Sequence, residues 1–233
     1  MTDHATQGLR ILIIGRGRMG SAVQEAALRS GHLVAGVMGR SEMADSTWPK
    51  ADVAVEFTAP DSAVDVIAAC RQRMLPLVSG TTGWAVHADE VQAASVEAGH
   101  PLLWAPNFSK GVYLFRKALK GAAQAMEGHA EFVPSVHEVH HTGKLDAPSG
   151  TAHAIGEDMS QLGWPDVPIT AQRLSGVPGT HEVEWRSEID SISLIHSAQN
   201  RSGFAQGAIE AAEWLSRHTG PCHKIFGMSD VWG

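Results

Sequence analysis

Short apolar runs alternate with amphipathic stretches along the first half of the chain. The first run, 9–14, is almost unbroken, which is typical of a strand buried on both faces of a parallel sheet. Apolar positions at helical spacing follow it and end at Gly31. Further strands are expected at 33–38, 52–57, 75–79 and 102–105, with a helix at 63–73. The alternation predicts an α/β fold with a doubly wound parallel sheet.

A glycine pattern, G-x-G-x-x-G, occupies residues 15–20 directly after the first run. In the order strand, turn, helix, strand, it is typical of a Rossmann-type dinucleotide site, although an unrelated α/β domain can also contain a glycine turn. Gly15 permits the tight turn, Gly17 lets the backbone approach a pyrophosphate, and Gly20 allows close packing. We therefore expect a cofactor contact from each residue of the set Gly15, Gly17, Arg18, Met19 and Gly20.

The end of the second expected strand carries Gly39 and Arg40, where an acidic residue would hold the ribose hydroxyls of NAD. Without a carboxylate at this position, a guanidinium can receive the 2′-phosphate of NADPH. Glu42 lies close enough in sequence to substitute partly for the missing acid. The pattern favours NADPH as the cofactor, with NADH possible.

The second half of the chain has a different pattern. A helix is expected at 111–126, and β-prone segments follow at 131–141, 169–174, 180–188 and 191–197. This mixture predicts a second α+β domain with a mixed or antiparallel sheet. A last helix from about 200 to 216 should return the chain to the first domain. We expect a dinucleotide-binding domain at 1–107 completed by 202–233, and a substrate-binding, catalytic and oligomerisation domain at 108–201, with Arg201 near the hinge.

The stretch 137–152 is dense in proton-transfer and anion-binding groups. Strand alternation sends His140 to one face and His137 and His141 to the other, which disfavours a metal site built from these histidines. Ser149 is expected to cap a helix whose first N–H groups, at Gly150 and Thr151, can bind a carboxylate. Three interpretations of this stretch remain: a polar surface loop, a metal site, or a proton donor beside an anion site.

The run His140-His141-x-x-Lys144-x-Asp146-Ala147-Pro148-Ser149-Gly150-Thr151-Ala152 resembles the signature of the dihydrodipicolinate reductase family, nicotinamide-dependent enzymes of the diaminopimelate route to lysine. Loops 80–83 and 105–108 also resemble family motifs. The resemblance implies that His140 is an acid/base residue and Lys144 a proton donor. It implies substrate binding by His141, Gly150 and Thr151, and cofactor binding by Gly80, Thr81, Thr82, Ala105, Pro106, Asn107 and Phe108.

For Thr81 and Asn107, turn formation and capping are the alternative roles. The family also implies a homotetramer built through the sheet of the second domain. The expected reaction is NAD(P)H-dependent reduction of 4-hydroxy-tetrahydrodipicolinate or dihydrodipicolinate, a cyclic C=N dicarboxylate, to tetrahydrodipicolinate. The alternatives are an aspartate- or homoserine-type dehydrogenase, a non-catalytic NADPH-binding protein, and a metal-dependent hydrolase using 137–141.

Composition narrows the partners of the protein. The chain has 233 residues, a 43% apolar content that supports a buried core, and a formal net charge of −7, which argues against nucleic acid. Two cysteines suit a reducing compartment, and the first ten residues do not resemble a signal peptide. No window approaches the ~20 apolar residues of a membrane helix. We expect a cytoplasmic protein with a small-molecule dicarboxylate substrate, no bound metal, no nucleic acid and no membrane association.

Overall fold

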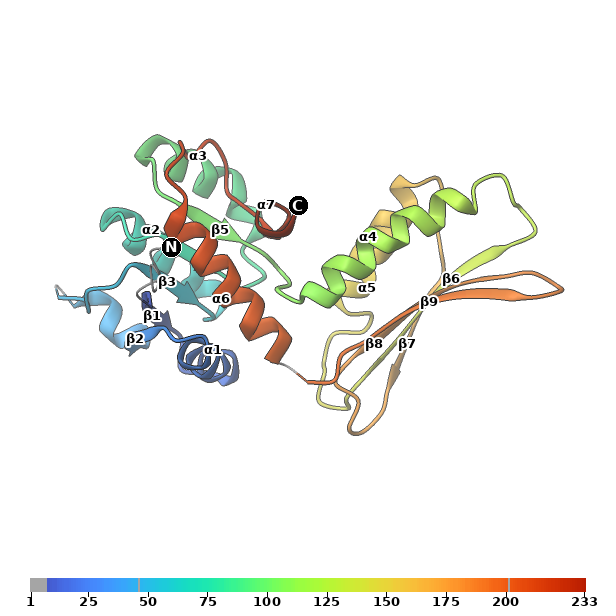
Figure 1. Ribbon diagram of the computed structural model, residues 1–233, viewed down its shortest axis with the longest axis horizontal. Helices are drawn as coiled ribbons and strands as arrows, with labels where there is room; N and C mark the ends of the chain where they lie inside the picture. The colour runs from blue at the N-terminus through green and yellow to red at the C-terminus, as the bar shows by residue number, and fades with distance from the viewer. Residues whose placement is uncertain (1–7, 46, 201) are drawn as a thin grey trace, which may run out of the picture. The chain divides into compact units, whose positions relative to one another are not determined.

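The computed structural model describes residues 8–45, 47–200 and 202–233, and the chain divides into two compact units (Figure 1). Unit 1 contains the chain up to Phe108 together with Phe204–Gly233, and unit 2 contains Ser109–Gly203. The second unit is therefore inserted into the first. Arg201, expected at the hinge, lies outside the described residues.

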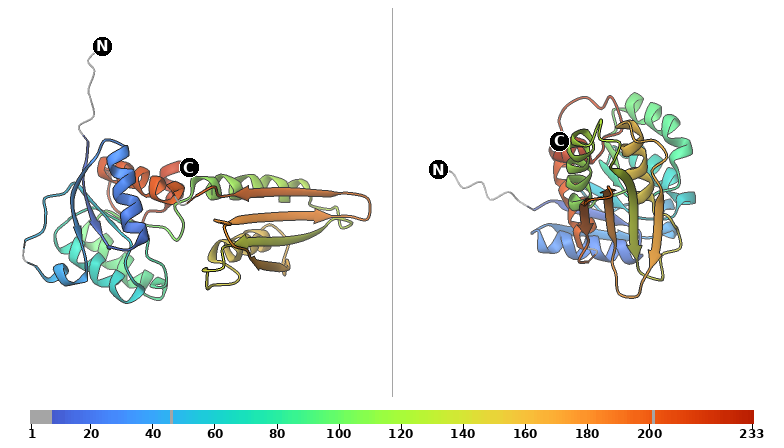
Figure 2. Two further views of the ribbon diagram at one scale, coloured as in Figure 1. Left: turned by 90° about the horizontal axis from the view of Figure 1, so that it is seen from below. Right: turned by 90° about the vertical axis from the view of Figure 1, so that its right-hand side faces the viewer.

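Unit 1 contains a five-stranded parallel sheet in the order β2-β1-β3-β4-β5. The strands are β1 (Arg10–Ile14), β2 (Leu33–Met38), β3 (Val53–Glu56), β4 (Leu77–Ser79) and β5 (Leu102–Trp104). Around the sheet lie α1 (Arg18–Arg29), η1 (Arg40–Ala44), α2 (Pro60–Gln72), η2 (Ala85–His87), α3 (Ala88–Ala98), α6 (Ser202–Arg217) and α7 (Met228–Trp232) (Figures 1 and 2).

Alternating residues of β1 serve two different cores. Ile11 and Ile13 pack in a cluster with residues of α1 and α6, whereas Leu12 and Ile14 pack in a cluster with residues of α2. A strand with helices on both faces must be apolar at every position, which explains the unbroken run. The predicted Rossmann-type doubly wound sheet is confirmed.

Three details of unit 1 differ from the prediction or were absent from it. Helix α2 begins at Pro60, three residues before the predicted start, and α3 and α7 were not predicted. Beyond α6, Phe226 forms a parallel bridge with Leu103 of β5 and joins the core. The C-terminal segment is thus part of the unit 1 fold.

Unit 2 contains a four-stranded mixed sheet in the order β7-β6-β8-β9, as predicted. Strands β6 and β7 run parallel, and the β6/β8 and β8/β9 pairs are antiparallel. The elements are α4 (Lys110–Ala125), β6 (Val133–His140), α5 (Gly150–Gln161), β7 (Ile169–Arg173), β8 (Thr180–Arg186) and β9 (Ser191–Ser197).

Helices α4 and α5 cover one face of this sheet, and their apolar side chains share a core with Val136, Val183 and Trp185. Arg116 of α4 binds Asp158 of α5 through two hydrogen bonds of 2.6 and 2.9 Å, which fixes the two helices together.

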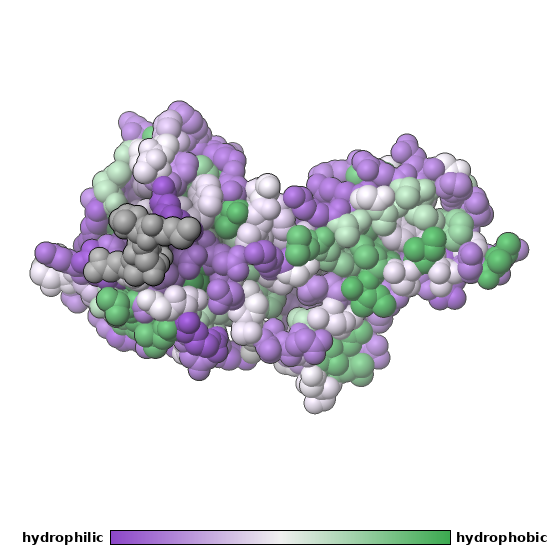
Figure 3. Space-filling model, in the orientation of Figure 1, coloured by the Kyte–Doolittle hydropathy of each residue, from purple (hydrophilic) through white to green (hydrophobic). Residues whose placement is uncertain are grey.

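The opposite face of the sheet carries no helix from the described part of unit 2. Val133 is 63% exposed and Ile195 is 57% exposed, and by strand alternation both belong to this face. On the face of unit 2 that Figure 3 shows, apolar residues also lie among the hydrophilic ones. None of the helices in the described ranges has the length and apolar character needed to cross a bilayer.

Candidate active site

The glycine turn after β1 has the backbone that the sequence predicts. Gly15 has φ +120°, and a Cβ there would lie 2.1 Å from the Phe57 carbonyl oxygen. A Cβ on Gly20 would lie 2.0 Å from the Gly15 oxygen, so both glycines are required by the fold itself. Gly17 differs, because a Cβ there would meet nothing within 4 Å. The space at Gly17 therefore fits a group that approaches the backbone from outside the protein, as a pyrophosphate does.

Helix α1 begins immediately after this turn, with Gly17 as N-cap and no side-chain cap. Arg18 is exposed in its first turn, whereas Met19 is partly buried against the core. An uncapped helix start that follows a glycine turn presents backbone N–H groups to an anion. The residues present thus fit a dinucleotide.

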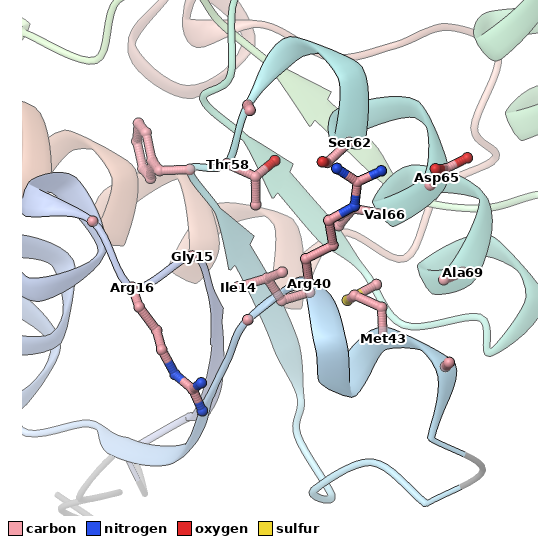
Figure 4. Close-up of a pocket in the computed structure, with 15 residues that line it drawn as sticks. Ile14, Gly15, Arg16, Arg40, Met43, Thr58, Ser62, Asp65, Val66 and Ala69 are labelled. Atoms are coloured by element: carbon pink, nitrogen blue, oxygen red, sulfur yellow. The ribbon is translucent and has the colours of Figure 1, made fainter.

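A cavity of about 720 Å³ adjoins the turn and extends between the ends of β1, β2 and β3 and helix α2 (Figure 4). Gly15, Gly17 and Arg40, three of the predicted cofactor residues, line it. Arg40 extends from η1 toward Ser62 of α2, and its exposed guanidinium makes no ion pair with any described residue (Figure 4). The α2 wall was not predicted from the sequence.

The corner at Gly39 contains a second arginine that sequence reasoning missed. Glu42 accepts a 2.7 Å hydrogen bond from the Gly39 N–H and forms an ion pair with Arg16. The Gly39 N–H and, to a smaller extent, the Arg16 guanidinium lower the pKa of Glu42 below its usual range against the opposing effect of burial. Glu42 is therefore an ionised carboxylate beside the cavity.

A buried carboxylate organises the loops after β3 and β4. Glu56 is fully buried and accepts hydrogen bonds from the hydroxyl groups of Thr58 and Thr81, at 2.9 and 2.8 Å, and from the Ser79 hydroxyl. It also accepts a 3.1 Å bond from the Thr58 N–H. The hydroxyl of Thr81 is thus directed into the protein, as its alternative role in turn formation requires.

The carbonyl of Thr81 accepts hydrogen bonds from two indole groups, Trp84 Nε1 and Trp104 Nε1, each at 2.9 Å. Gly80 is packed against Phe57, because a Cβ at Gly80 would lie 2.1 Å from that ring. Thr82 is exposed. The loop is held rigidly, and Thr82 and the backbone of its neighbours are the parts it can offer to a ligand.

The loop after β5 has an alternating exposure pattern. Ala105 and Phe108 are buried, Pro106 is exposed and Asn107 is half-buried. Because parallel strands end at one edge of the sheet, this loop and the loop 80–82 share an edge with the glycine turn. Neither loop lines the cavity of Figure 4, so the two predicted halves of the cofactor site occupy different parts of this edge.

Strand β6 in unit 2 separates the histidines as predicted. His140 is buried on the helix-covered face together with Glu138, whereas His137 lies on the other face and contacts Thr170 Oγ1 at 2.8 Å. His141 follows the strand and is half-buried. A metal site built from His137, His140 and His141 does not converge.

Glu138 is the centre of the buried polar cluster in unit 2. It is fully buried and accepts hydrogen bonds from the Ser149 N–H at 3.0 Å, from the Ser149 hydroxyl and from Arg173 Nη2 at 3.0 Å. Burial alone would raise the pKa of Glu138, but Ser149, Arg173 and His140 together lower it. The cluster therefore contains a stable carboxylate next to His140, with Nδ1 3.4 Å from Glu138 Oε2.

Two further histidines lie on the same face of the sheet. His181 of β8 has its ring centroid 5.1 Å from that of His140, and His196 of β9 lies opposite His181. Burial lowers the pKa of all three, and in His181 burial and the neighbouring His140 lower it to about 4. At neutral pH these imidazoles are uncharged, so His140 can accept a proton there.

Sequence reasoning missed both His181 and Arg173. Glu138, His140 and His181 bring one possible metal-ligand atom each within 4.8 Å of one another. The oxygens of Glu138, however, already bind Ser149 and the guanidinium of Arg173, and a cation beside a guanidinium is disfavoured. These bonds occupy the Glu138 oxygens, and Oε2 lies 3.4 Å from His140 Nδ1.

The loop between β6 and α5 contains the predicted proton donor. Lys144 Nζ lies 2.8 and 3.0 Å from the two carboxylate oxygens of Asp146. Arg173 donates to the Lys144 carbonyl at 3.3 Å and to the Asp146 carbonyl, which ties the loop to β7. Helix α5 begins at Gly150, and its N-cap Ser149 accepts from the Ala152 N–H at 3.2 Å, as predicted.

The carboxylate of Asp146 lies at the start of α5. Burial would raise its pKa, but the Lys144 ammonium and the backbone N–H groups of Asp146 and Gly150 lower it. Lys144 and Gly150, two of the predicted catalytic and substrate-binding residues, thus bind one carboxylate together. Thr151 follows in the first turn, half-buried.

Comparison with known families covers nearly the whole chain. Residues 9–108 match the family described as Dihydrodipicolinate reductase, N-terminus, and residues 111–232 match Dihydrodipicolinate reductase, C-terminus. The two matches meet close to the point where unit 1 gives way to unit 2.

Curated relatives agree with these matches. A protein of Christiangramia forsetii named 4-hydroxy-tetrahydrodipicolinate reductase is 36% identical over 236 residues, covering 96% of this chain and 97% of the relative. A protein of Stenotrophomonas maltophilia with the same name is 38% identical over 235 residues, covering 93% and 96%.

A solved structure, dipicolinate-bound dihydrodipicolinate reductase from Paenisporosarcina sp. TG-14, superposes with a TM-score of 0.71 at 22% identity. The superposition covers 96% of this chain and 99% of the other, which shows a shared fold.

Proposed function

Because the chain belongs to the dihydrodipicolinate reductase family, we propose that it reduces 4-hydroxy-tetrahydrodipicolinate, or its dehydrated form, to tetrahydrodipicolinate. It is an NAD(P)H-dependent oxidoreductase of the diaminopimelate route to lysine. Family membership decides against the aspartate- or homoserine-type dehydrogenase, the non-catalytic NADPH-binding protein and the metal-dependent hydrolase.

One observation carries the assignment of the substrate site. Asp146 places a carboxylate against both Lys144 Nζ and the start of α5, and the substrate brings carboxylates of its own. We infer that a substrate carboxylate displaces Asp146 and takes over these donors, with His141 and Thr151 beside it. A helix start binds the anion without adding a titrating group.

The reduced nicotinamide would supply the hydride, and the protein must supply one proton to complete the reduction. Lys144 carries that proton in our proposal and attracts the dianion at the same time. His140 is uncharged at neutral pH because burial lowers its pKa. In our proposal it therefore accepts a proton in the site, and Lys144 is the first proton donor. Glu138, held by Ser149 and Arg173, positions His140.

The proposal extends to the cofactor contacts. The glycine turn with Arg18 and Met19 would hold the pyrophosphate, and the loops of Gly80, Thr81, Thr82, Ala105, Pro106, Asn107 and Phe108 would lie along the nicotinamide half. Arg40 would bind the 2′-phosphate of NADPH, since its guanidinium faces the cavity without a carboxylate partner. Changing Arg40 to Ala should then weaken NADPH binding much more than NADH binding.

The test of activity is the loss of reduced-nicotinamide absorbance when the protein receives NADPH, or NADH, with substrate made in situ from pyruvate and aspartate semialdehyde by the preceding synthase. Lys144→Ala should lower turnover by a factor of about 10² to 10⁴. Lys120→Ala, an exposed lysine on α4, is the matched control and should retain full turnover. A loss below about threefold for Lys144→Ala would remove Lys144 from the proton-donor role.

We also propose that the open face of the unit 2 sheet forms the interface of a homotetramer. The exposed side chains of Val133 and Ile195 on this face support an interface there. Light scattering of the wild-type protein and of Val133→Asp with Ile195→Asp tests it, and an unchanged mass would refute this surface. A cytoplasmic location belongs to the same proposal, and it is favoured by the free thiols of Cys70 and Cys222.

A further inference from the structure

The corner at the end of β2 contains a carboxylate that comes from a different position in the chain. Gly39 has no side chain, yet a Cβ built there would lie 3.2 Å from Glu42 Oε2 and 3.3 Å from Arg16 Nη1. Glu42 thus fills the space that an acidic residue at position 39 would use to hold ribose hydroxyls. Its 2.7 Å bond from the Gly39 N–H holds the carboxylate there.

Arg16 forms an ion pair with this carboxylate. Its Nη2 binds Glu42 Oε1 and also donates to the Val37 carbonyl at 3.3 Å. Arg16 belongs to the glycine turn after β1, so the pair joins that turn to the end of β2. In the view of Figure 4 the Arg16 and Arg40 side chains extend in opposite directions.

Charge decides which nucleotide this corner favours. With Arg16 in place, two guanidinium groups face two carboxylates, Glu42 and the cavity-lining Asp65, so the net charge beside the cavity is about zero. Without Arg16 the net charge would fall to about −1, and Glu42 would repel a 2′-phosphate that carries nearly two negative charges. NADH has only a 2′-hydroxyl there, which a carboxylate can accept from.

We propose that Arg16 sets the cofactor preference by neutralising Glu42, which leaves Arg40 to bind the 2′-phosphate of NADPH without competition from Glu42. Arg16 is thus a specificity-determining residue that acts through Glu42. The inference rests on the proposed function, because it takes the cavity to be the site of NAD(P)H.

A double-mutant cycle separates this mechanism from direct contact between Arg16 and the phosphate. The proteins are wild type, Arg16→Ala, Glu42→Gln and the double variant. Glu42→Gln keeps an oxygen for the Gly39 N–H and removes only the charge. Dissociation constants for NADPH and NADH are measured through the enhancement of nicotinamide fluorescence, which needs no turnover. Arg29→Ala, an exposed arginine paired with Glu25 on α1, is the control.

Arg16→Ala should lower the ratio of NADPH to NADH affinity by about tenfold, and Glu42→Gln should raise it by a few-fold. The double variant should behave like Glu42→Gln, because Arg16 has nothing left to neutralise. An equal effect of Arg16→Ala in both backgrounds would overturn the inference and assign Arg16 to the phosphate itself. No effect of Arg16→Ala would also overturn it.

If the protein binds both nucleotides and Arg16→Ala leaves the ratio of NADPH to NADH affinity unchanged, this inference alone is refuted. Failure of wild-type protein to bind either nucleotide would refute it together with the proposed function.

Discussion

Removal of Arg173 should destabilise unit 2 through the carboxylate that it leaves behind. Arg173 is the cation on Glu138, which is fully buried, while the Arg173 side chain is 19% exposed. The guanidinium also donates to the Lys144 and Asp146 carbonyl groups and to the Gln172 carbonyl at 2.8 Å. Arg173→Ala therefore removes both the charge partner of Glu138 and the hydrogen bonds that hold the loop between β6 and α5.

The magnitude follows from what remains around Glu138. Deletion of one partner of a buried ion pair costs about 3–5 kcal/mol, because the other charge stays buried. Ser149 still donates two hydrogen bonds to Glu138, so we expect the lower end, about 3 kcal/mol. For a chain of this size that corresponds to a fall in Tm of about 6–12 °C.

Urea unfolding monitored by circular dichroism measures the loss. Arg186→Ala is the matched control, since Arg186 on the same sheet is 68% exposed and pairs with Glu184. It should cost no more than about 1 kcal/mol. In the double variant Arg173→Ala with Glu138→Gln, much of the 3 kcal/mol should be recovered, because no buried charge remains.

The pH dependence provides the refutation. In the wild type the pKa of Glu138 is lowered, so its stabilising contribution is present above the unfolded pKa and is lost as pH falls through the folded pKa. In Arg173→Ala burial should dominate and raise that pKa, so the difference in unfolding free energy between variant and wild type should narrow toward pH ~4. A gap that is constant with pH, or absent, would show that Glu138 does not depend on Arg173.

Three other predictions concern single residues. Gly17→Ala should leave Tm unchanged, because a Cβ there meets nothing within 4 Å, and should weaken nucleotide binding measured by fluorescence; unchanged affinity would place the pyrophosphate elsewhere. The pKa of His181 is about 4 in the folded protein, below its unfolded value. The free energy of unfolding of the wild type should therefore fall by up to about 3 kcal/mol as pH drops from ~6.5 to ~4. Urea titrations of His181→Asn should show a weaker dependence on pH. Glu56→Gln should fold with near wild-type Tm and Glu56→Leu should not, since leucine leaves the buried hydroxyl donors of Ser79 and Thr81 without this acceptor. Similar Tm values for the two variants would contradict this.

The fold could be predicted from the sequence largely because its signals are local. The unbroken apolar run in β1 reports burial on both faces, and Ser149 marks the start of α5 by its own capping bond. Helix α3 was not predicted because only Val91 and Ser95 are buried along it, which leaves little periodicity to detect.

Less of the site could be predicted from the sequence, because several of its residues come from strands that are distant in sequence. Glu138 and His140 share a face by simple alternation, but His181 and Arg173 reach them only through the registers of β8 and β7. Register is a tertiary property that no local pattern of these strands encodes. For the same reason the pairing of Arg16 with Glu42, across the ends of β1 and β2, could not be predicted.

The insertion of unit 2 into unit 1 has a consequence for the order of folding during synthesis. Nine of the twenty described buried residues in one core cluster of unit 1 come from the segment after Phe204, which is synthesised after unit 2. Unit 2 is continuous in sequence, so its elements are all available earlier. Since domains form as their chains emerge, the nascent protein should complete unit 2 while the first 108 residues still expose apolar surface to chaperones.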